Sequence, residues 1–89
     1  MQDVKVFIIP RKVERAGQLK TALRAAMDGA GVGVWVLERE SGVSHQTLAN
    51  LANGRGGVER GKADAIAEAL GVPVGDLFVH KDGAELVGA

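Results

Sequence analysis

A tight corner between two short helical segments, near the middle of the chain, most constrains what this sequence can fold into. Residues 34–40 have the composition of a short helix, and Gly42 follows as a helix-breaking residue. Val43 is apolar, and Ser44 is a residue type that caps the N-terminus of a helix. A further helix is therefore predicted over His45–Ala52, directly after a very short turn.

The two helices can share an apolar seam. Apolar spacing places Leu37 of the helix at 34–40 on the side that faces Leu48 and Leu51 of the helix at His45–Ala52. Such packing makes a rigid helix-turn-helix, in which one face of the helix at His45–Ala52 stays free. Gln46 and Asn50 lie together on that free face because they are four residues apart. Amide side chains both donate and accept hydrogen bonds, as the major-groove edge of adenine requires.

Further side chains in and after this helix suit a DNA surface. His45 can donate to a guanine edge or to a phosphate, and Thr47 offers a hydroxyl for phosphate and a methyl group for thymine. Arg55 follows the helix at a position that suits a phosphate contact. The candidate DNA-binding residues are Ser44, His45, Gln46, Thr47, Asn50, Arg55, Arg60 and Lys62.

The remaining elements follow from apolar spacing and from helix breakers. Val4–Ile9 is rich in β-branched residues and precedes a proline, so we expect a short strand at a sheet edge. Helical spacing predicts a helix over Gly17–Met27, preceded by one helical turn at Arg11–Arg15. A fourth helix is expected at Glu59–Leu70, followed by a short last turn of helix at Val74–Phe78.

The chain has 89 residues, which fits one small domain. We divide it into an N-terminal strand or arm (1–16), a helix-turn-helix domain (17–78) and a C-terminal tail (79–89). In the tail, Asp82-Gly83 between two short apolar pieces is typical of a hairpin. The strand can pair with this tail, or it can pair with a second copy and give a two-fold homodimer.

Composition restricts the chemistry of the chain. It contains no Cys, which excludes a disulfide scaffold, a thiolate zinc site and a Cys nucleophile. The net charge is zero, but residues 1–27 carry six basic and two acidic side chains and residues 63–89 carry one basic and five acidic. The chain can therefore present one positive face. We expect no enzyme activity, no cofactor, no metal, no small-molecule substrate and no membrane span.

The chain resembles the Cro and λ-repressor type of helix-turn-helix protein, the XRE-like family. The resemblance covers about residues 17–78 and is carried by Leu37, Gly42-Val43-Ser44, Thr47-Leu48, Leu51, Asn53-Gly54-Arg55 and residues 66–78. It implies a mainly α domain of four to five helices with the third helix in the major groove of a double-stranded DNA operator. To this we add the short N-terminal strand and a hairpin-like C-terminal tail.

The resemblance extends more weakly to the flanks. They resemble those of small helix-turn-helix proteins of actinobacterial phages. This implies a transcriptional regulator, Cro-like or immunity-repressor-like, in the cytoplasm of a bacterial host cell.

Two positions depart from the family pattern. Val34 stands where the family often has a Gln that binds a phosphate, so that anchor is missing or is replaced by a backbone N–H. Met27 and Ala52 stand where many members have a buried Arg and Glu pair. An apolar pair is a reasonable substitute, because replacing both members of a buried ion pair can be neutral or stabilising.

Several residues near the motif have simpler interpretations. Trp35 is interpreted as a partly buried packing residue of the second helix. Lys20 and Arg24 lie on the polar side of the predicted first helix, where they face either DNA or solvent. The glycine-rich segment 29–33 follows a helix rather than a strand, so it is an interhelical loop and not a nucleotide-binding loop.

A function of another class is also open. The chain can be a protein-interaction module, antitoxin-like or an anti-repressor partner, in which the helix-turn-helix is structural. Gln46 and Asn50 would then contact a protein, or would be solvated residues of a surface helix. Selection of bound sequences from random DNA separates the two hypotheses, since only a DNA-binding regulator recovers a motif.

Overall fold

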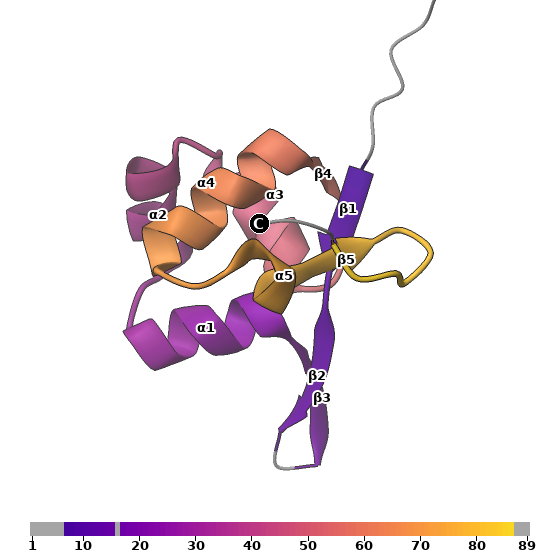
Figure 1. Cartoon of the computed structure of the whole chain (residues 1–89). Helices are drawn as coiled ribbons and strands as arrows, with labels where there is room; N and C mark the ends of the chain where they lie inside the picture. The colour runs from indigo at the N-terminus through magenta and orange to yellow at the C-terminus, as the bar shows by residue number, and fades with distance from the viewer. Residues whose placement is uncertain (1–6, 16, 87–89) are drawn as a thin grey trace, which may run out of the picture.

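Helices make up most of the secondary structure, which confirms the prediction of a mainly α fold. The computed structural model describes residues 7–15 and 17–86 (Figure 1). The helices are α1 (Ala22–Ala30), α2 (Val34–Ser41), α3 (His45–Ala52), α4 (Arg60–Leu70) and α5 (Val74–Leu77). The strands are β1 (Phe7–Pro10), β2 (Lys12–Arg15), β3 (Gln18–Thr21), β4 (Val58–Glu59) and β5 (Phe78–His80). Within the described ranges, no helix has the length and apolar character needed to cross a membrane.

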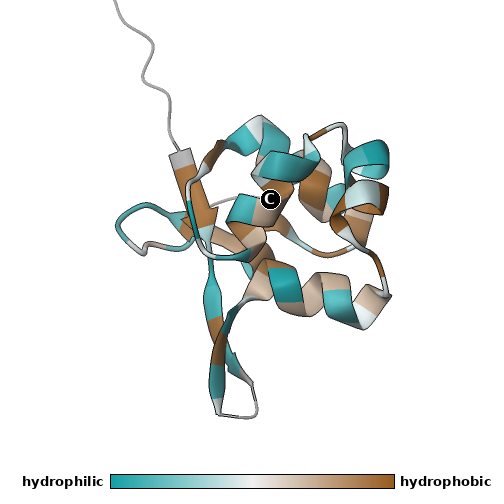
Figure 2. Cartoon of the chain, turned by 180° about the vertical axis from the view of Figure 1, so that it is seen from behind, coloured by the Kyte–Doolittle hydropathy of each residue, from teal (hydrophilic) through white to brown (hydrophobic). Residues whose placement is uncertain are grey.

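The hydrophobic core lies where the helices meet, and Figure 2 shows hydrophobic residues on their inward faces. The predicted seam between α2 and α3 is confirmed, because Leu37, Val43, Leu48 and Leu51 each expose 4% or less of their surface. Burying an aliphatic side chain of this size stabilises the fold by about 1.5–3 kcal/mol relative to leaving it exposed. The seam therefore fixes α3 against α2.

Two expectations about the neighbouring helices also hold. Met27 and Ala52 are both buried, as expected for an apolar pair at these two positions. The fourth helix is present as α4 and begins at Arg60, one residue later than predicted. It ends at Leu70 as predicted, where Gly71 adopts the left-handed conformation with φ of 73°.

The N-terminal strand is central in its sheet, which corrects the prediction of an edge strand. β1 lies between β4 and β5 and pairs with both in antiparallel orientation (Figure 1). It includes Pro10, which pairs with Phe78, while residues 4–6 of the predicted strand lie outside the described residues. The proline is tolerated because β4 pairs only with Phe7 and Ile8, so no strand lies beside Pro10 on that side. The strand therefore pairs within the chain.

Lys12–Arg15 and Gln18–Thr21 pair as a β-hairpin and are not helical, so two predictions are wrong. β2 replaces the helical turn expected at Arg11–Arg15, and β3 replaces the beginning of the helix expected from Gly17. Gly17 occupies the turn with φ of 78°, a left-handed conformation that glycine adopts without strain. α1 begins only after Thr21, whose side-chain oxygen accepts a hydrogen bond from the backbone N–H of Arg24 at 3.0 Å.

The alternation of side chains explains the hairpin. On β2, Lys12 and Glu14 are exposed and Val13 between them is partly buried, which is the two-residue period of a strand. Leu19 has helical spacing to Leu23, which favoured a longer helix. However, Leu19 exposes 71% of its surface and takes no part in the core.

The C-terminal tail contributes a strand and a turn. β5 pairs with β1, which confirms the pairing within the chain that the sequence left open. The predicted turn at Asp82-Gly83 is present, since the N–H of Gly83 donates to the carbonyl of His80 and the N–H of His80 donates to the carbonyl of Ala84, each at 2.8 Å. Residues 81–86 contain no second strand, so the expected hairpin is limited to its first strand and its turn.

The contact between Gly57 and β1 gives a test of this sheet. A Cβ atom at Gly57 would lie 2.7 Å from the carbonyl oxygen of Ile8, which is backbone and cannot rotate away. Gly57→Ala is expected to lower the free energy of unfolding by about 1–3 kcal/mol, measured by urea denaturation.

Gly61→Ala is the matched control for that substitution. Nothing lies within 4 Å of a Cβ at Gly61, which is in α4. The control is expected to leave stability unchanged or to raise it by up to about 1 kcal/mol, because alanine is the better helix former. Equal effects of the two substitutions would contradict the close approach of Gly57 to β1.

Candidate nucleic-acid interface

The corner between α2 and α3 is held by backbone geometry and by two hydrogen bonds of one hydroxyl group. Gly42 has φ of 80°, which a larger side chain would strain, and its N–H donates to the carbonyl of Glu38 at 2.8 Å. The hydroxyl of Ser41 donates to the carbonyl of Leu37 at 2.7 Å and accepts from the N–H of Val43 at 3.2 Å. These contacts end α2 and set the direction in which α3 begins.

Ser44 caps α3, as the sequence predicts. Its side-chain oxygen accepts a hydrogen bond from the backbone N–H of Thr47 at 3.3 Å, and its hydroxyl lies 3.0 Å from the hydroxyl of Thr47. Ser44 is exposed and Thr47 is half-buried. Two hydroxyl groups therefore lie side by side at the first turn of the helix.

The polar face of α3 is at the surface. Gln46 and Asn50 are exposed, whereas Leu48 and Leu51 on the other side of the helix are buried in the seam. Neither amide makes a side-chain hydrogen bond within the part of the chain that the structure describes. Their donors and acceptors are thus available to a partner molecule.

Trp35 and His45 form a stacked pair at the surface, which corrects the prediction that Trp35 is partly buried. Trp35 exposes 65% of its surface, and its ring centroid lies 3.9 Å from that of His45 with 27° between the ring planes. The seam is occupied by Leu37, and a residue two positions away in a helix points to a different side. The sequence identifies His45 as a candidate but does not indicate that Trp35 lies against it.

Glu38 fixes the backbone and the ring of His45. Its Oε2 accepts from the backbone N–H of His45 at 3.0 Å and lies 3.3 Å from Nδ1 of the ring. Because a carboxylate only accepts hydrogen bonds, Nδ1 carries the proton in this contact, and Nε2 of the neutral ring is an acceptor. Donation from Nε2 to guanine or phosphate while this contact is kept therefore needs a proton on both ring nitrogens. Sequence reasoning missed Glu38, which is seven residues from His45 and meets it only across the corner.

The loop after α3 turns back on the helix and brings Arg55 to its C-terminal end. The N–H of Arg55 donates to the carbonyl of Asn50 at 2.7 Å, and the N–H of Gly54 donates to the carbonyl of Leu51 at 3.0 Å. Gly54 has φ of 81°, which allows this turn without strain. Arg55 is exposed, so its guanidinium group is accessible beside the polar face.

Arg60 and Lys62 both lie in the first turn of α4 but differ in availability. Nε of Arg60 lies 3.0 Å from Oδ1 of Asp64 in an exposed ion pair four residues apart. Such a pair contributes only about 0.3–0.5 kcal/mol, so a phosphate can compete with Asp64. Lys62 is exposed and has no ion pair among the described residues.

The start of α1 lies against the end of α3 and brings one of the two cations on the first helical segment, Arg24, into contact with that end. Nη2 of Arg24 donates to Oδ1 of Asn53 at 3.1 Å, and the hydroxyl of Thr21 donates to the carbonyl of Ala52 at 2.8 Å. Arg24 therefore lies beside α3. Nζ of Lys20 lies 3.6 Å from Oδ2 of Asp28, in an exposed contact along α1.

These features define a helix-turn-helix domain of the DNA-binding class. In residues 7–15 and 17–86, no group of three or more His, Cys, Asp or Glu side chains is placed to hold a metal ion. The family model described as the Cro/C1-type HTH DNA-binding domain matches residues 22–83. The chain therefore belongs to the Cro/C1-type helix-turn-helix family, which confirms the resemblance found in the sequence. Comparisons with curated proteins and with solved structures gave no match.

The contact between Glu38 and His45 predicts a pH dependence of stability. The pKa of Glu38 is lowered because its carboxylate accepts hydrogen bonds from the backbone N–H and then from the ring of His45. A carboxyl whose pKa is lower in the folded state stabilises the fold above its unfolded pKa of about 4.3, and that contribution is lost as the pH falls through the folded pKa. Denaturation midpoints measured between about pH 5 and pH 3 should fall more steeply for the wild type than for Glu38→Gln.

Glu40→Gln is the control for this measurement. Glu40 is an exposed carboxylate on the same helix and makes no side-chain hydrogen bond among the described residues. Its variant should keep the wild-type slope. If Glu38→Gln and the wild type lose stability in parallel, the proposed contact with His45 does not stabilise the folded state.

Proposed function

We propose that this chain is a sequence-specific transcriptional regulator that inserts α3 into the major groove of double-stranded DNA. The observation that carries the proposal is the pair of exposed amides, Gln46 and Asn50, on a helix whose other face is locked into the core. Each amide can make two hydrogen bonds to the major-groove edge of an adenine. A rigid support matters because base recognition depends on placing these groups accurately.

Other residues position the helix on the duplex in this proposal. Ser44 and Thr47 contact a phosphate or thymine at the start of α3, and Arg55 contacts a phosphate at its end. His45, oriented by Trp35 and Glu38, contacts a base edge or a phosphate. Arg60 and Lys62 contact the DNA backbone from the start of α4.

The proposed regulator is Cro-like or resembles a small immunity repressor, and it acts in the cytoplasm of a bacterial cell, with a phage origin as part of the hypothesis. It requires no catalysis, cofactor or small-molecule substrate. Binding as a homodimer to a two-fold symmetric operator is included. The contact between copies would lie outside β1, because β1 is already paired with β4 and β5.

Net charge gives this proposal a measurable consequence. A chain with 11 basic and 11 acidic residues attracts DNA weakly without sequence-specific contacts. Selection from a random duplex library at about 150 mM salt should therefore recover a motif above a low background. Recovery of no motif would contradict the proposal and favour the protein-interaction module.

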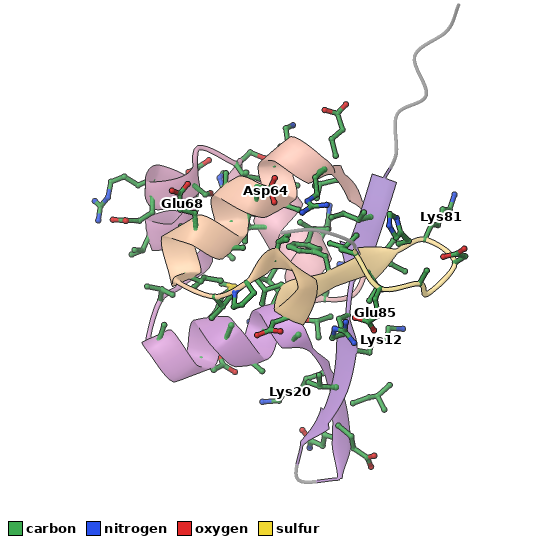
Figure 3. All side chains as sticks on the ribbon, viewed as in Figure 1. Lys12, Lys20, Asp64, Glu68, Lys81 and Glu85 are labelled. Atoms are coloured by element: carbon green, nitrogen blue, oxygen red, sulfur yellow. The ribbon has the colours of Figure 1, made fainter. Side chains whose placement is uncertain are left out.

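Substitution of the two amides tests their roles separately. Gln46→Ala or Asn50→Ala should each weaken binding to the selected duplex by about 1–3 kcal/mol and relax the preference at one base position. Gel-shift titration gives the affinity, and repeated selection gives the preference. Glu68→Ala, an exposed substitution on α4 (Figure 3), is the control and should bind as the wild type does. Wild-type affinity and preference in both amide variants would show that the assigned face is wrong.

Trp35 provides an intrinsic probe of the same face. It is the single tryptophan, and its exposed ring is stacked on the first residue of α3. Titration with the selected duplex should change its fluorescence emission in step with binding, because DNA beside α3 alters the solvent contact of the ring. A scrambled duplex at the same concentration should leave the emission unchanged. Saturating binding without any change in emission would place the DNA away from α2 and α3.

A further inference from the structure

The β2–β3 hairpin projects from the body of the molecule (Figure 1) and precedes the family-matched residues 22–83. Its base is firmly attached. The backbone N–H of Ala22 donates to the carbonyl of Arg11 at 2.7 Å, and that of Arg11 donates to the carbonyl of Leu77 at 2.8 Å. The guanidinium group of Arg11 also donates to the carbonyl of Gly75 at 2.9 Å and pairs with Glu85. The hairpin is therefore a fixed addition to the helix-turn-helix.

One face of the hairpin is turned toward the C-terminal end of α3. Lys12 pairs with Thr21 in the strand register, so the two side chains lie on the same face. The hydroxyl of Thr21 donates to the carbonyl of Ala52 at 2.8 Å, which sets that face against the end of α3. A Cβ atom at Gly54 would lie 3.8 Å from Cε of Lys12, so Lys12 reaches the loop that follows α3.

A cavity of about 400 Å³ opens between this face and the end of α3. Lys12 and Leu19 line it from the hairpin, Arg24 lines it from α1, and Asn53 lines it from the end of α3. Arg24 is held toward Asn53 by the hydrogen bond at 3.1 Å. The cavity is thus built from three separate elements that meet at the end of the proposed recognition helix.

The cavity is positively charged. Lys12, Lys20 and Arg24 line it, and no carboxylate does. Neither Lys12 nor Arg24 forms an ion pair within the described residues. Lys20 is directed along α1 toward Asp28 at 3.6 Å, and Figure 3 shows it on the opposite side of the hairpin from Lys12. Lys12 and Arg24 are therefore the two cations available to an anion at this place.

The position of the cavity indicates which kind of anion would bind there. α3 has eight residues and spans about 12 Å, which is comparable to the width of the major groove, about 12 Å. The C-terminal end of a helix lying in that groove comes close to a phosphate backbone. Lys12 and Arg24 stand beside that end, together with Leu19, which exposes 71% of its surface and can pack against a deoxyribose.

We propose that the hairpin is a second DNA-binding element, in which Lys12 and Arg24 bind backbone phosphates next to the C-terminal end of α3. This inference rests on the proposed function, because it requires α3 in the major groove. The hairpin adds affinity and lengthens the contacted DNA without adding base preference, since phosphate contacts carry no sequence information.

Substitutions of Lys12 test the proposal on the full chain with the selected duplex. Lys12→Gln should weaken binding by about threefold to tenfold near 100 mM salt and reduce the slope of log affinity against log salt by about 0.9. The double variant Lys12→Gln with Arg24→Gln should reduce the slope by about 1.8. The selected motif should not change in either variant. Lys12→Arg keeps the charge and should bind as the wild type does.

Lys81→Gln is the matched control. Lys81 is exposed and lies at the turn after β5, away from the hairpin (Figure 3). It should retain wild-type affinity and salt slope. A second comparison uses a duplex trimmed to the selected motif. Trimming should reduce the affinity of the wild type more than that of the Lys12→Gln variant, because the flanking phosphates are the proposed ligands.

Two outcomes would overturn the role of the hairpin while leaving the proposed function intact. In the first, the Lys12 and Arg24 variants bind with wild-type affinity and slope, and Gln46→Ala still weakens binding. In the second, the same variants bind normally and Leu19→Ser lowers the sedimentation coefficient of the free protein, which makes the hairpin a contact between copies. Failure of the wild type to select any motif would instead overturn the proposed function and this inference with it.

Discussion

The packing of α3 against α2 across a glycine corner is the constraint on which the rest of the structure depends. Gly42 ends α2 in a conformation that other residues adopt only with strain, and Val43 then enters the core between the helices. Once Leu48 and Leu51 are buried, the opposite side of α3 must face outward. The exposure of the polar face is therefore a consequence of apolar packing, and the proposed DNA contact uses a surface that folding has already fixed.

The strands reinforce the same helix from its other end. Thr21 both caps α1 and donates to the last residue of α3, so the hairpin, α1 and α3 share one hydrogen-bonding residue. After Arg55 the chain enters β4, which pairs with β1 and returns the backbone to the sheet. Both ends of α3 are thus held, by the corner at its start and by the hairpin and loop at its end. A helix held in this way loses little conformational entropy on binding a duplex.

Local patterns predicted the helices α2 to α5, but they placed the first helix at 17–27 instead of Ala22–Ala30, so that Gly29 and Ala30 were wrongly assigned to the loop. Contacts distant in sequence account for the hairpin and the stacked rings that local patterns missed. The bounds of α3, the burial of Leu37 and the capping by Ser44 follow from breakers, apolar spacing and residue type, and the structure confirms them. The hairpin was missed because the position of Leu19 fits the spacing of a helix as well as that of a strand. Only the N-cap at Thr21 shows that the helix begins after Leu19. The stacking of Trp35 on His45 depends on the angle of the corner, which spacing alone does not encode.

Amide NMR spectra of the ¹⁵N-labelled protein, recorded with and without its selected duplex, test the central claim most directly. The account predicts that the side-chain NH₂ signals of Gln46 and Asn50, with the backbone signals of residues 44–50, undergo the largest changes. Unchanged signals from both amides, with the largest changes in α5 and β5, would contradict the account, because the duplex would then occupy a surface that the corner between α2 and α3 does not create.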